Sequence, residues 1–261
     1  LIVYSFYKYV NYIYTYFTFE PFYCKISNSC PLRGREDKSI DMVLCDLPYG
    51  VLNKNNRNAH WDSILPFDKL WKQYERITKD NSCIALFCDG MFMAELMLSN
   101  KKMWKYNLVW NKVLPSGFLN ANRMPLRQTE EVAIFYKKQP IYNAQKSIGK
   151  KNHSKGKIKE NKNNNYGKCK FVDNSEKLGN MKCPTSLISF SKTHSSQMIH
   201  PTQKPVSLLK RLIEIFTDEG DVVIDPCAGS GTTLRASAEL NRNSYGFEID
   251  KNFCRLAKEK M

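Results

Sequence analysis

Two stretches of the chain combine glycine, carboxylate and aromatic residues at a spacing that suits chemistry. In the first, a β-branched run at residues 221–224 precedes the sequence DPCAGSGTT, and an Ala- and Leu-rich run follows at 234–240. This order predicts a strand, a tight turn and a helix, with glycines that let a ligand approach the backbone. Glu248 follows after a second strand-like run, at a place where Rossmann-type folds bind ribose hydroxyls. The sequence therefore predicts a pocket for an adenosine-bearing cofactor.

The glycine-containing turn differs from the two common phosphate-binding loops. It is too short for G-x-G-x-x-G, and it lacks the lysine that the G-x-x-x-x-G-K-[ST] loop requires. A cofactor with adenosine but without phosphates therefore fits better. An ordinary strand–turn–helix corner is the competing interpretation. The candidate cofactor-binding residues of this region are Asp225, Pro226, Cys227, Ala228, Gly229, Ser230, Gly231, Thr232, Thr233 and Glu248.

The second stretch is Asp46-Leu47-Pro48-Tyr49, which follows an apolar, strand-like run at 40–45. Asp46 is thus expected at the carboxyl end of a strand, where open α/β sheets place their ligands. A carboxylate, backbone carbonyls and an aromatic face together can hold a planar base by its exocyclic amine. An amine held in this way can attack an electrophilic methyl group. Taken alone, the tetrapeptide fits equally well a strand that simply ends in a turn.

Together the two motifs resemble those of the amino-methyltransferases of DNA, whose signature is Asp-Pro-Pro-Tyr with a glycine-rich S-adenosylmethionine loop. A third block, His200-Pro201-Thr202-Gln203-Lys204-Pro205, is similar to one that precedes the cofactor loop in the β group of that family. The three blocks occur in the β-group order, and the resemblance covers roughly residues 37–261. Leu47 stands where the family usually has proline, as in many phage and prophage members. The backbone carbonyl needed there does not depend on the side chain.

The resemblance implies an α/β, Rossmann-like S-adenosylmethionine-dependent methyltransferase fold with a basic insertion. The fold is expected to be circularly permuted, so that the catalytic motif precedes the cofactor motif. Asp46 and the carbonyls of Leu47 or Pro48 would accept hydrogen bonds from the amine of a flipped-out base, and Tyr49 would stack on that base. These four residues are the catalytic candidates.

The same resemblance assigns the cofactor, S-adenosylmethionine, to residues 225–233, with Glu248 on its ribose. The third block would close the pocket through His200, Thr202 and Lys204, with Lys204 near the methionine carboxylate. An exposed lysine at a helix entry is the alternative for Lys204.

The implied target is N6 of adenine in double-stranded DNA, because N4-cytosine members more often carry Ser in place of Asp46. Cytosine N4, an RNA substrate, and a non-catalytic DNA-binding subunit with the same fold remain alternatives. The mechanism requires no metal, and a homodimer is left open.

Composition agrees with a polyanionic partner. The 261 residues carry a net charge of +15, although a generally Lys-rich chain is the alternative explanation. The nine cysteines include no C-x-x-C pair. No metal site is expected, because no common zinc spacing matches His194, His200, Cys169 and Cys183. Four cysteines in or beside apolar runs are expected to be buried thiols in a reducing compartment: Cys45, Cys83, Cys88 and Cys227.

The chain is expected to have four segments. They are a divergent amino-terminal segment, the catalytic half of the methyltransferase domain, a basic target-recognition insertion, and the cofactor-binding half, at 1–36, 37–138, 139–196 and 197–261. A solvated linker is the alternative for the insertion. The aromatic start at 1–23 is near the length of a membrane span, but its polar residues argue against an anchor. The expected location is the cytoplasm, or the nucleus in a eukaryote.

Four basic residues are candidates for DNA binding: Arg123, Arg127, Lys137 and Lys138. The two arginines lie in a stretch without periodicity, which predicts a loop that contacts phosphates near the flipped base. Pairing of these arginines with Glu130 and Glu131 is the alternative.

Overall fold

The computed structural model describes residues 24–27, 37–52, 62–150 and 180–260. Most of the predicted divergent segment at 1–36 and the middle of the predicted basic insertion therefore lie outside the described residues. Contacts divide the chain into two compact units, one of residues 1–143 with 186–261 and one of residues 144–185. The first unit holds all of the predicted catalytic and cofactor-binding residues.

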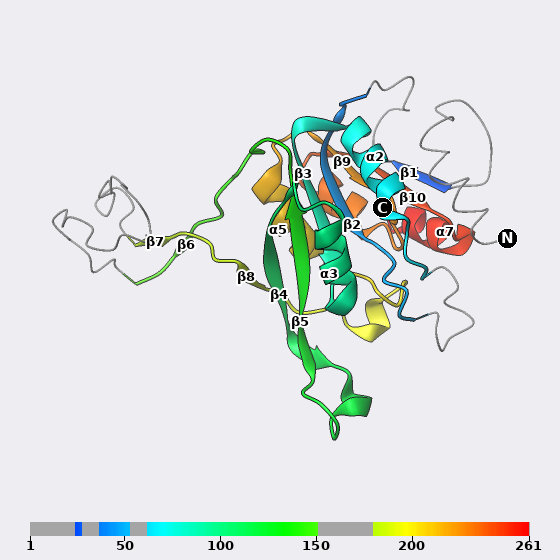
Figure 1. Ribbon diagram of the computed structural model, residues 1–261. Coiled ribbons are helices and arrows are strands. Elements are labelled where there is room, and N and C mark those ends of the chain that lie inside the picture. The colour runs from blue at the N-terminus through cyan, green and yellow to red at the C-terminus, as the bar shows by residue number, and fades with distance from the viewer. Residues whose placement is uncertain (1–23, 28–36, 53–61, 151–179, 261) are drawn as a thin grey trace. The chain divides into compact units, whose positions relative to one another are not determined.

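The described part of the first unit is built on an eight-stranded sheet in the order β1-β10-β9-β2-β3-β5-β4-β8 (Figure 1). Four neighbouring strands run parallel: β10 (Asn243–Glu248), β9 (Val222–Asp225), β2 (Ile40–Asp46) and β3 (Thr78–Cys88). Antiparallel pairing joins β5 (Arg127–Phe135) to β3 and to β4 (Trp104–Ser116), and β1 (Cys24–Ser27) to β10. A mixed α/β fold with a mostly parallel central sheet results, as predicted.

Helices cover both faces of this sheet, because successive side chains of β2 point to opposite faces and are apolar on both. Val43 and Cys45 join a core with α2 (Phe67–Ile77) and α3 (Gly90–Ser99). Met42 and Leu44 join the opposite core with α5 (Val206–Phe216). A strand buried on both faces is an apolar run without polar alternation, which is what residues 40–45 show. Two further helices, α6 (Thr232–Ala238) and α7 (Lys251–Glu259), share a smaller cluster.

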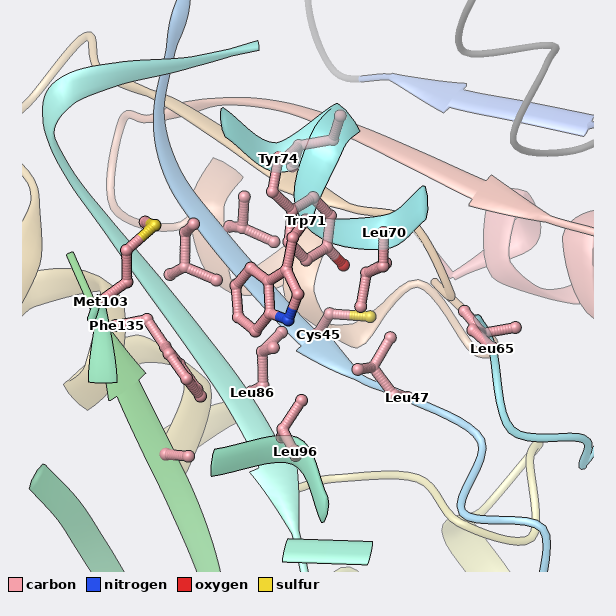
Figure 2. Close-up of a cluster of buried hydrophobic side chains, with 14 of the residues drawn as sticks. Cys45, Leu47, Leu65, Leu70, Trp71, Tyr74, Leu86, Leu96, Met103 and Phe135 are labelled. Carbon is pink, nitrogen blue, oxygen red and sulfur yellow. The ribbon is translucent and has the colours of Figure 1, made fainter. Parts of the chain in front are cut away.

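The core beneath α2 fixes the strand that carries Asp46. Figure 2 shows Trp71 and Tyr74 of α2 lying over Cys45 and Phe135 of the sheet. The Trp71 and Phe135 ring centroids are 4.7 Å apart, and the Trp71 Nε1–H donates to Ser99 Oγ at 2.7 Å. Full burial of one such side chain stabilises a fold by roughly 1.5–3 kcal/mol. The end of β2 is therefore held in place by packing.

β4 and β5 extend beyond the residues that pair with β8 and β3. Their extensions form a hairpin that projects from the sheet and includes a 3-10 turn, η2 (Phe118–Asn120) (Figure 1). Gly117 begins the connection between the two strands with φ 87°, a region that favours glycine. Local sequence pattern does not reveal this hairpin, because most of its side chains are exposed and apolar residues do not alternate with polar ones along it.

The second unit contains a short antiparallel pair, β6 (Ser147–Ile148) with β7 (Met181–Lys182). The second unit, at residues 144–185, contains fewer residues than the insertion predicted at 139–196. Residues 187–189 instead form β8 (Leu187–Ser189), which lies parallel to β4, and another 3-10 turn, η4 (Ser195–Gln197), follows. Three residues are too few for a periodicity signal. Within the described ranges, no helix has the length and apolar character to cross a membrane.

Candidate functional site

The carboxyl ends of the parallel strands bring three predicted residues to one edge of the sheet. Asp46 ends β2, Asp225 ends β9 and Glu248 ends β10. The register pairs Gly246 with Asp225 and Asp46 with Phe87, so these strand ends are in line. Open α/β sheets bind ligands at this edge. The two motifs predicted to hold base and cofactor are thus neighbours in space.

The carboxylate of Asp46 is held by two side chains. The Tyr49 hydroxyl donates to Oδ1 at 3.0 Å, and the Lys204 ammonium donates to Oδ2 at 2.7 Å. The Tyr49 ring stacks on Phe92 with centroids 4.8 Å apart, which fixes the plane of the ring. Burial raises the pKa of the Asp46 carboxyl, and the neighbouring Lys204 limits that rise. Asp46 is an oriented acceptor at the sheet edge.

A buried residue that sequence analysis missed, Asp62, shapes the turn after Tyr49. Its carboxylate accepts hydrogen bonds from the backbone N–H groups of Gly50, Val51 and Leu52 at 3.1, 2.8 and 2.6 Å. Only 3% of Asp62 is exposed. A carboxylate that accepts three N–H groups fixes a turn much as an N-cap fixes a helix. No local pattern could have identified it, because its partners lie ten or more residues earlier.

Lys204 is neither exposed nor at the surface of a helix entry. Its ammonium lies between Asp46 and Glu130, at 3.3 Å from Glu130 Oε2, and 4.9 Å from the centroid of the Phe87 ring. Burial opposes the charge on Lys204, but the two carboxylates outweigh it and raise the pKa of the ammonium. The predicted contact with a methionine carboxylate remains a prediction.

The turn predicted to hold the cofactor is braced by its own side chains. Asp225 accepts from the backbone N–H of Cys227 at 3.1 Å and from the Thr233 hydroxyl at 2.6 Å. Burial raises the pKa of Asp225 to about 6. Gly229 and Gly231 have φ of 48° and 72°, a region that favours glycine. The two glycines thus serve the sharp turn that sequence analysis expected.

Glu248 links the glycine turn to the end of β10. Its Oε2 accepts from the backbone N–H of Gly229 at 2.7 Å, and its Oε1 accepts from that of Asp250 at 2.8 Å. Burial raises the pKa of the Glu248 carboxyl. Gly246 lets α6 approach β10, since a Cβ there would lie 2.6 Å from Leu234 Cδ1. The acidic residue is therefore at the turn, as predicted from its spacing.

His200 of the third sequence block lies against the glycine turn. A Cβ added to Gly229 would come within 3.4 Å of the imidazole, and the Phe253 ring centroid lies 4.4 Å from that of His200. His200 Nδ1 lies 3.1 Å from the Thr202 hydroxyl. The block predicted to close the cofactor pocket is thus next to the glycine turn in the folded chain.

Protonation of His200 is expected to weaken the fold. Burial and the nearby Lys204 lower the pKa of His200 to about 4, from an unfolded value near 6.5. The unfolded state therefore binds the proton first, and this contribution to stability is lost as pH falls from about 6.5 to 4. Its size is at most about 3.5 kcal/mol, because each tenfold change in proton affinity is worth about 1.4 kcal/mol. Chemical denaturation across this pH range should show a shallower loss for His200→Gln than for the wild type, and parallel curves would contradict it.

The four predicted DNA-binding residues separate into two groups. Arg123 and Arg127 are exposed on the β4–β5 hairpin, at the same sheet edge as Asp46. Lys137 and Lys138 lie beyond the other end of β5 and pair with Asp80 at 3.3 and 3.1 Å. The nine residues of β5 separate the two groups by roughly 30 Å.

Among the described residues, the arginines do not form the alternative pairs with Glu130 and Glu131. Arg127 pairs with Asp89 at 3.5 Å, while Glu130 binds lysines and Glu131 accepts from Asn107. Among the residues with described positions, no group of three or more His, Cys, Asp or Glu side chains could hold a metal ion. Cys169 lies outside them.

Comparison with known proteins places this geometry among related chains. The family model N6_N4_Mtase, described as DNA methylase, matches residues 40–259. The Type II methyltransferase M.HpaI of Haemophilus parainfluenzae is 25% identical over 250 residues, or 88% of this chain and 70% of that protein. The solved M1.HpyAVI–SAM complex is similar with a TM-score of 0.56 and 24% identity, over 86% of this chain and 90% of that one. The cytosine-N4-specific PvuII DNA methyltransferase has a TM-score of 0.59 and 15% identity, over 85% and 79% of the two chains.

Proposed function

Because this chain belongs to the N6/N4 DNA methylase family, we propose that it transfers a methyl group from S-adenosylmethionine to the exocyclic N6 amine of a flipped-out adenine in double-stranded DNA. The observation that carries the proposal is the place of Asp46. Its carboxylate lies at the carboxyl edge of the sheet, on the strand next to β9, which leads into the glycine turn. A base amine held there would face a methyl donor held at the turn.

The residues around the glycine turn fit S-adenosylmethionine. Gly229 and Gly231 leave the backbone of the turn without side chains, and the turn has no lysine to demand a phosphate. The oxygens of Glu248 accept backbone hydrogen bonds from Gly229 and Asp250, and a carboxylate has about four acceptor positions, so a ribose hydroxyl can still bind. When bound, this cofactor supplies an electrophilic methyl group on a sulfonium. His200, which packs against the Phe253 ring, would cover it.

Asp46 and its neighbours supply orientation and charge for the amine. An amine inside a duplex cannot be reached, so the base must leave the stack. The oxygens of Asp46 each keep an acceptor position for the amine N–H, and the backbone carbonyl of Leu47 or Pro48 accepts the second N–H. Phe92 fixes the plane of Tyr49, on which the base stacks. The rate gain comes from positioning and from a preorganised negative charge.

Three alternatives are distinguished by experiment. Cytosine N4 carries the same kind of amine, and the cytosine-N4-specific PvuII enzyme shares the fold. Adenine is favoured here because Asp46 stands where N4 enzymes of the family more often have Ser. RNA could present the same base, and a non-catalytic subunit could keep the fold without the activity.

The test is to incubate the purified chain with duplex DNA and methyl-labelled S-adenosylmethionine, digest the DNA and identify the labelled nucleoside. Label in N6-methyladenine is expected, and a parallel reaction with RNA should stay unlabelled. Label in N4-methylcytosine would keep the mechanism and overturn the base. No label in any polymer, with S-adenosylmethionine binding absent by calorimetry, would favour the non-catalytic subunit.

The β4–β5 hairpin is proposed to contact DNA phosphates. Arg123 and Arg127 are exposed on it, and the Arg127–Asp89 pair is too exposed to hold that side chain strongly. Removing the positive charge that neutralises one phosphate should reduce the slope of log K against log salt by roughly one. The Arg123→Ala/Arg127→Ala double variant is therefore expected to lower the slope by about two.

The matched control removes the same charge from the far end of β5. Lys137→Ala/Lys138→Ala should leave the salt slope near the wild-type value, because these lysines lie at the opposite sheet edge and pair with Asp80. Binding measured by fluorescence anisotropy at several salt concentrations gives both slopes. Equal changes in the two double variants would show that net charge, not the hairpin, sets DNA binding.

A further inference from the structure

Four alternating charges connect the candidate catalytic carboxylate to the base of the β4–β5 hairpin. The order is Asp46, Lys204, Glu130 and Lys112, and we call these four residues the ion-pair network. Lys204 Nζ lies 2.7 Å from Asp46 Oδ2 and 3.3 Å from Glu130 Oε2. Glu130 Oε1 lies 3.2 Å from Lys112 Nζ. Glu130 and Lys112 carry no role in the site as predicted from the sequence.

The ion-pair network is largely shielded from water. The side chains of Lys112 and Lys204 are only 5% and 11% exposed, and those of Glu130 and Asp46 are 21% and 22% exposed. Ions are costly to bury unless their charges are paired, so such a set has to be close to neutral. Two ammonium groups and two carboxylates sum to zero. Lys112 also contacts the Ser116 hydroxyl at 3.2 Å, so its position is set by β4.

The Asp46–Lys204 pair alone would be electrically neutral, as burial requires, so the second pair calls for another explanation. During transfer, the amine nitrogen forms its bond to the methyl carbon as the sulfur–methyl bond breaks and that electron pair stays on sulfur. The positive charge passes to nitrogen until a proton leaves through the Asp46 carboxylate to water. A negative charge near the amine favours this transition state. Lys204, which lies on Asp46, would by itself cancel that negative charge.

Glu130 lies on the other side of Lys204 and offsets its positive charge. We propose that Glu130 and Lys112 are positioning residues that hold Lys204 and balance its charge, so that Asp46 presents an effective negative charge to the amine. This inference rests on the proposed function, but it is the same for adenine and cytosine, since both present an exocyclic amine. Glu130 acts through Lys204 and does not touch the substrate.

The critical variant is Glu130→Gln, which keeps the shape and leaves one excess positive charge beside Asp46. We expect kcat to fall roughly 10- to 100-fold, less than when a group that contacts the reacting atoms is removed, with little change in KM for S-adenosylmethionine. Glu130 also raises the pKa of Asp46 through charge repulsion. Its removal should therefore move the acidic limb of the kcat–pH profile to lower pH.

A second variant separates charge balance from simple support of the fold. Glu130→Gln/Lys112→Gln removes one charge of each sign, so the net charge of the ion-pair network returns to zero. We expect the double variant to have a kcat about tenfold higher than the single variant. Glu131→Gln is the matched control, because Glu131 is the next residue of β5 and bonds Asn107 instead. It should keep kcat within about twofold of the wild type.

The outcomes discriminate clearly. Wild-type kcat in Glu130→Gln, or a double variant slower than the single one with an unshifted pH profile, would overturn the charge-balance role. Label on either base in the wild type upholds the transferase, whatever the variants do. A wild type that labels no base would overturn the proposed function and this inference together.

Discussion

Asp46→Ala is expected to lower kcat by about 10²- to 10³-fold, while S-adenosylmethionine still binds. The carboxylate is the anion at the sheet edge that can orient the amine and stabilise the charge that develops on it, and loss of one such preorganised group typically costs about 10²–10³-fold. The substitution also leaves Lys204 with Glu130 as its remaining carboxylate partner among the ion pairs of the described residues. The bound base would then face a positive charge where it needs a negative one.

Cofactor binding should survive this change because the glycine turn is braced independently. Asp225, Thr233 and Glu248 hold that turn through contacts that do not include Asp46. The measurements are single-turnover methyl transfer and calorimetric binding of S-adenosylmethionine. Asp68→Ala is the control, since Asp68 is an exposed residue in the first turn of α2. More than a tenth of the wild-type kcat in Asp46→Ala would exclude Asp46 from the chemistry.

Gly229→Val is expected to weaken S-adenosylmethionine binding by about 100-fold or more. Gly229 has φ 48°, where a β-branched residue is strained by about 1–3 kcal/mol. A Cβ there would already lie 3.4 Å from the His200 ring, and the valine methyl groups extend further. The turn would have to shift, which breaks the bond from its N–H to Glu248 and displaces the side chain predicted to cover the cofactor.

The control for this substitution is another glycine with a left-handed backbone. Gly220→Val places the same side chain at φ 84°, where a Cβ would meet nothing within 4 Å. Both variants should lose thermal stability, Gly229→Val more than Gly220→Val, but only Gly229→Val should lose cofactor affinity. Calorimetry and thermal denaturation measure the two effects separately. Equal cofactor affinity in the two variants would place the cofactor away from this turn.

The local features of the site were predictable because they depend on neighbours in the sequence. The strand, the G-x-G turn and the following helix form within residues 222–238, and the glycines take the left-handed backbone that the turn requires. Asp46 at the end of β2 follows from an apolar run that stops at a carboxylate. The α/β fold was implied by the family resemblance that these motifs carry.

The interior contacts of the site were not predictable in the same way. Lys204 and Asp46 are 158 residues apart, and Glu130 was considered only as a partner for arginines. Asp62 and the β4–β5 hairpin have no periodic pattern to reveal them. Hydrophobic period reports which face of an element is buried, but it does not report which element lies beside it.

The sequence by itself thus determined the two motifs, their places at strand ends and the family to which they point. Only the tertiary structure decided which charges meet there. Because β5 runs antiparallel to β3, Glu130 lies at the Asp46 edge, while Lys137 and Lys138 lie at the opposite one. Because Lys204 lies two residues before the start of α5, the packing of that helix against β2 brings its ammonium to Asp46. Strand order and direction are set by burial across the whole sheet, and so they decide the electrostatics of the site.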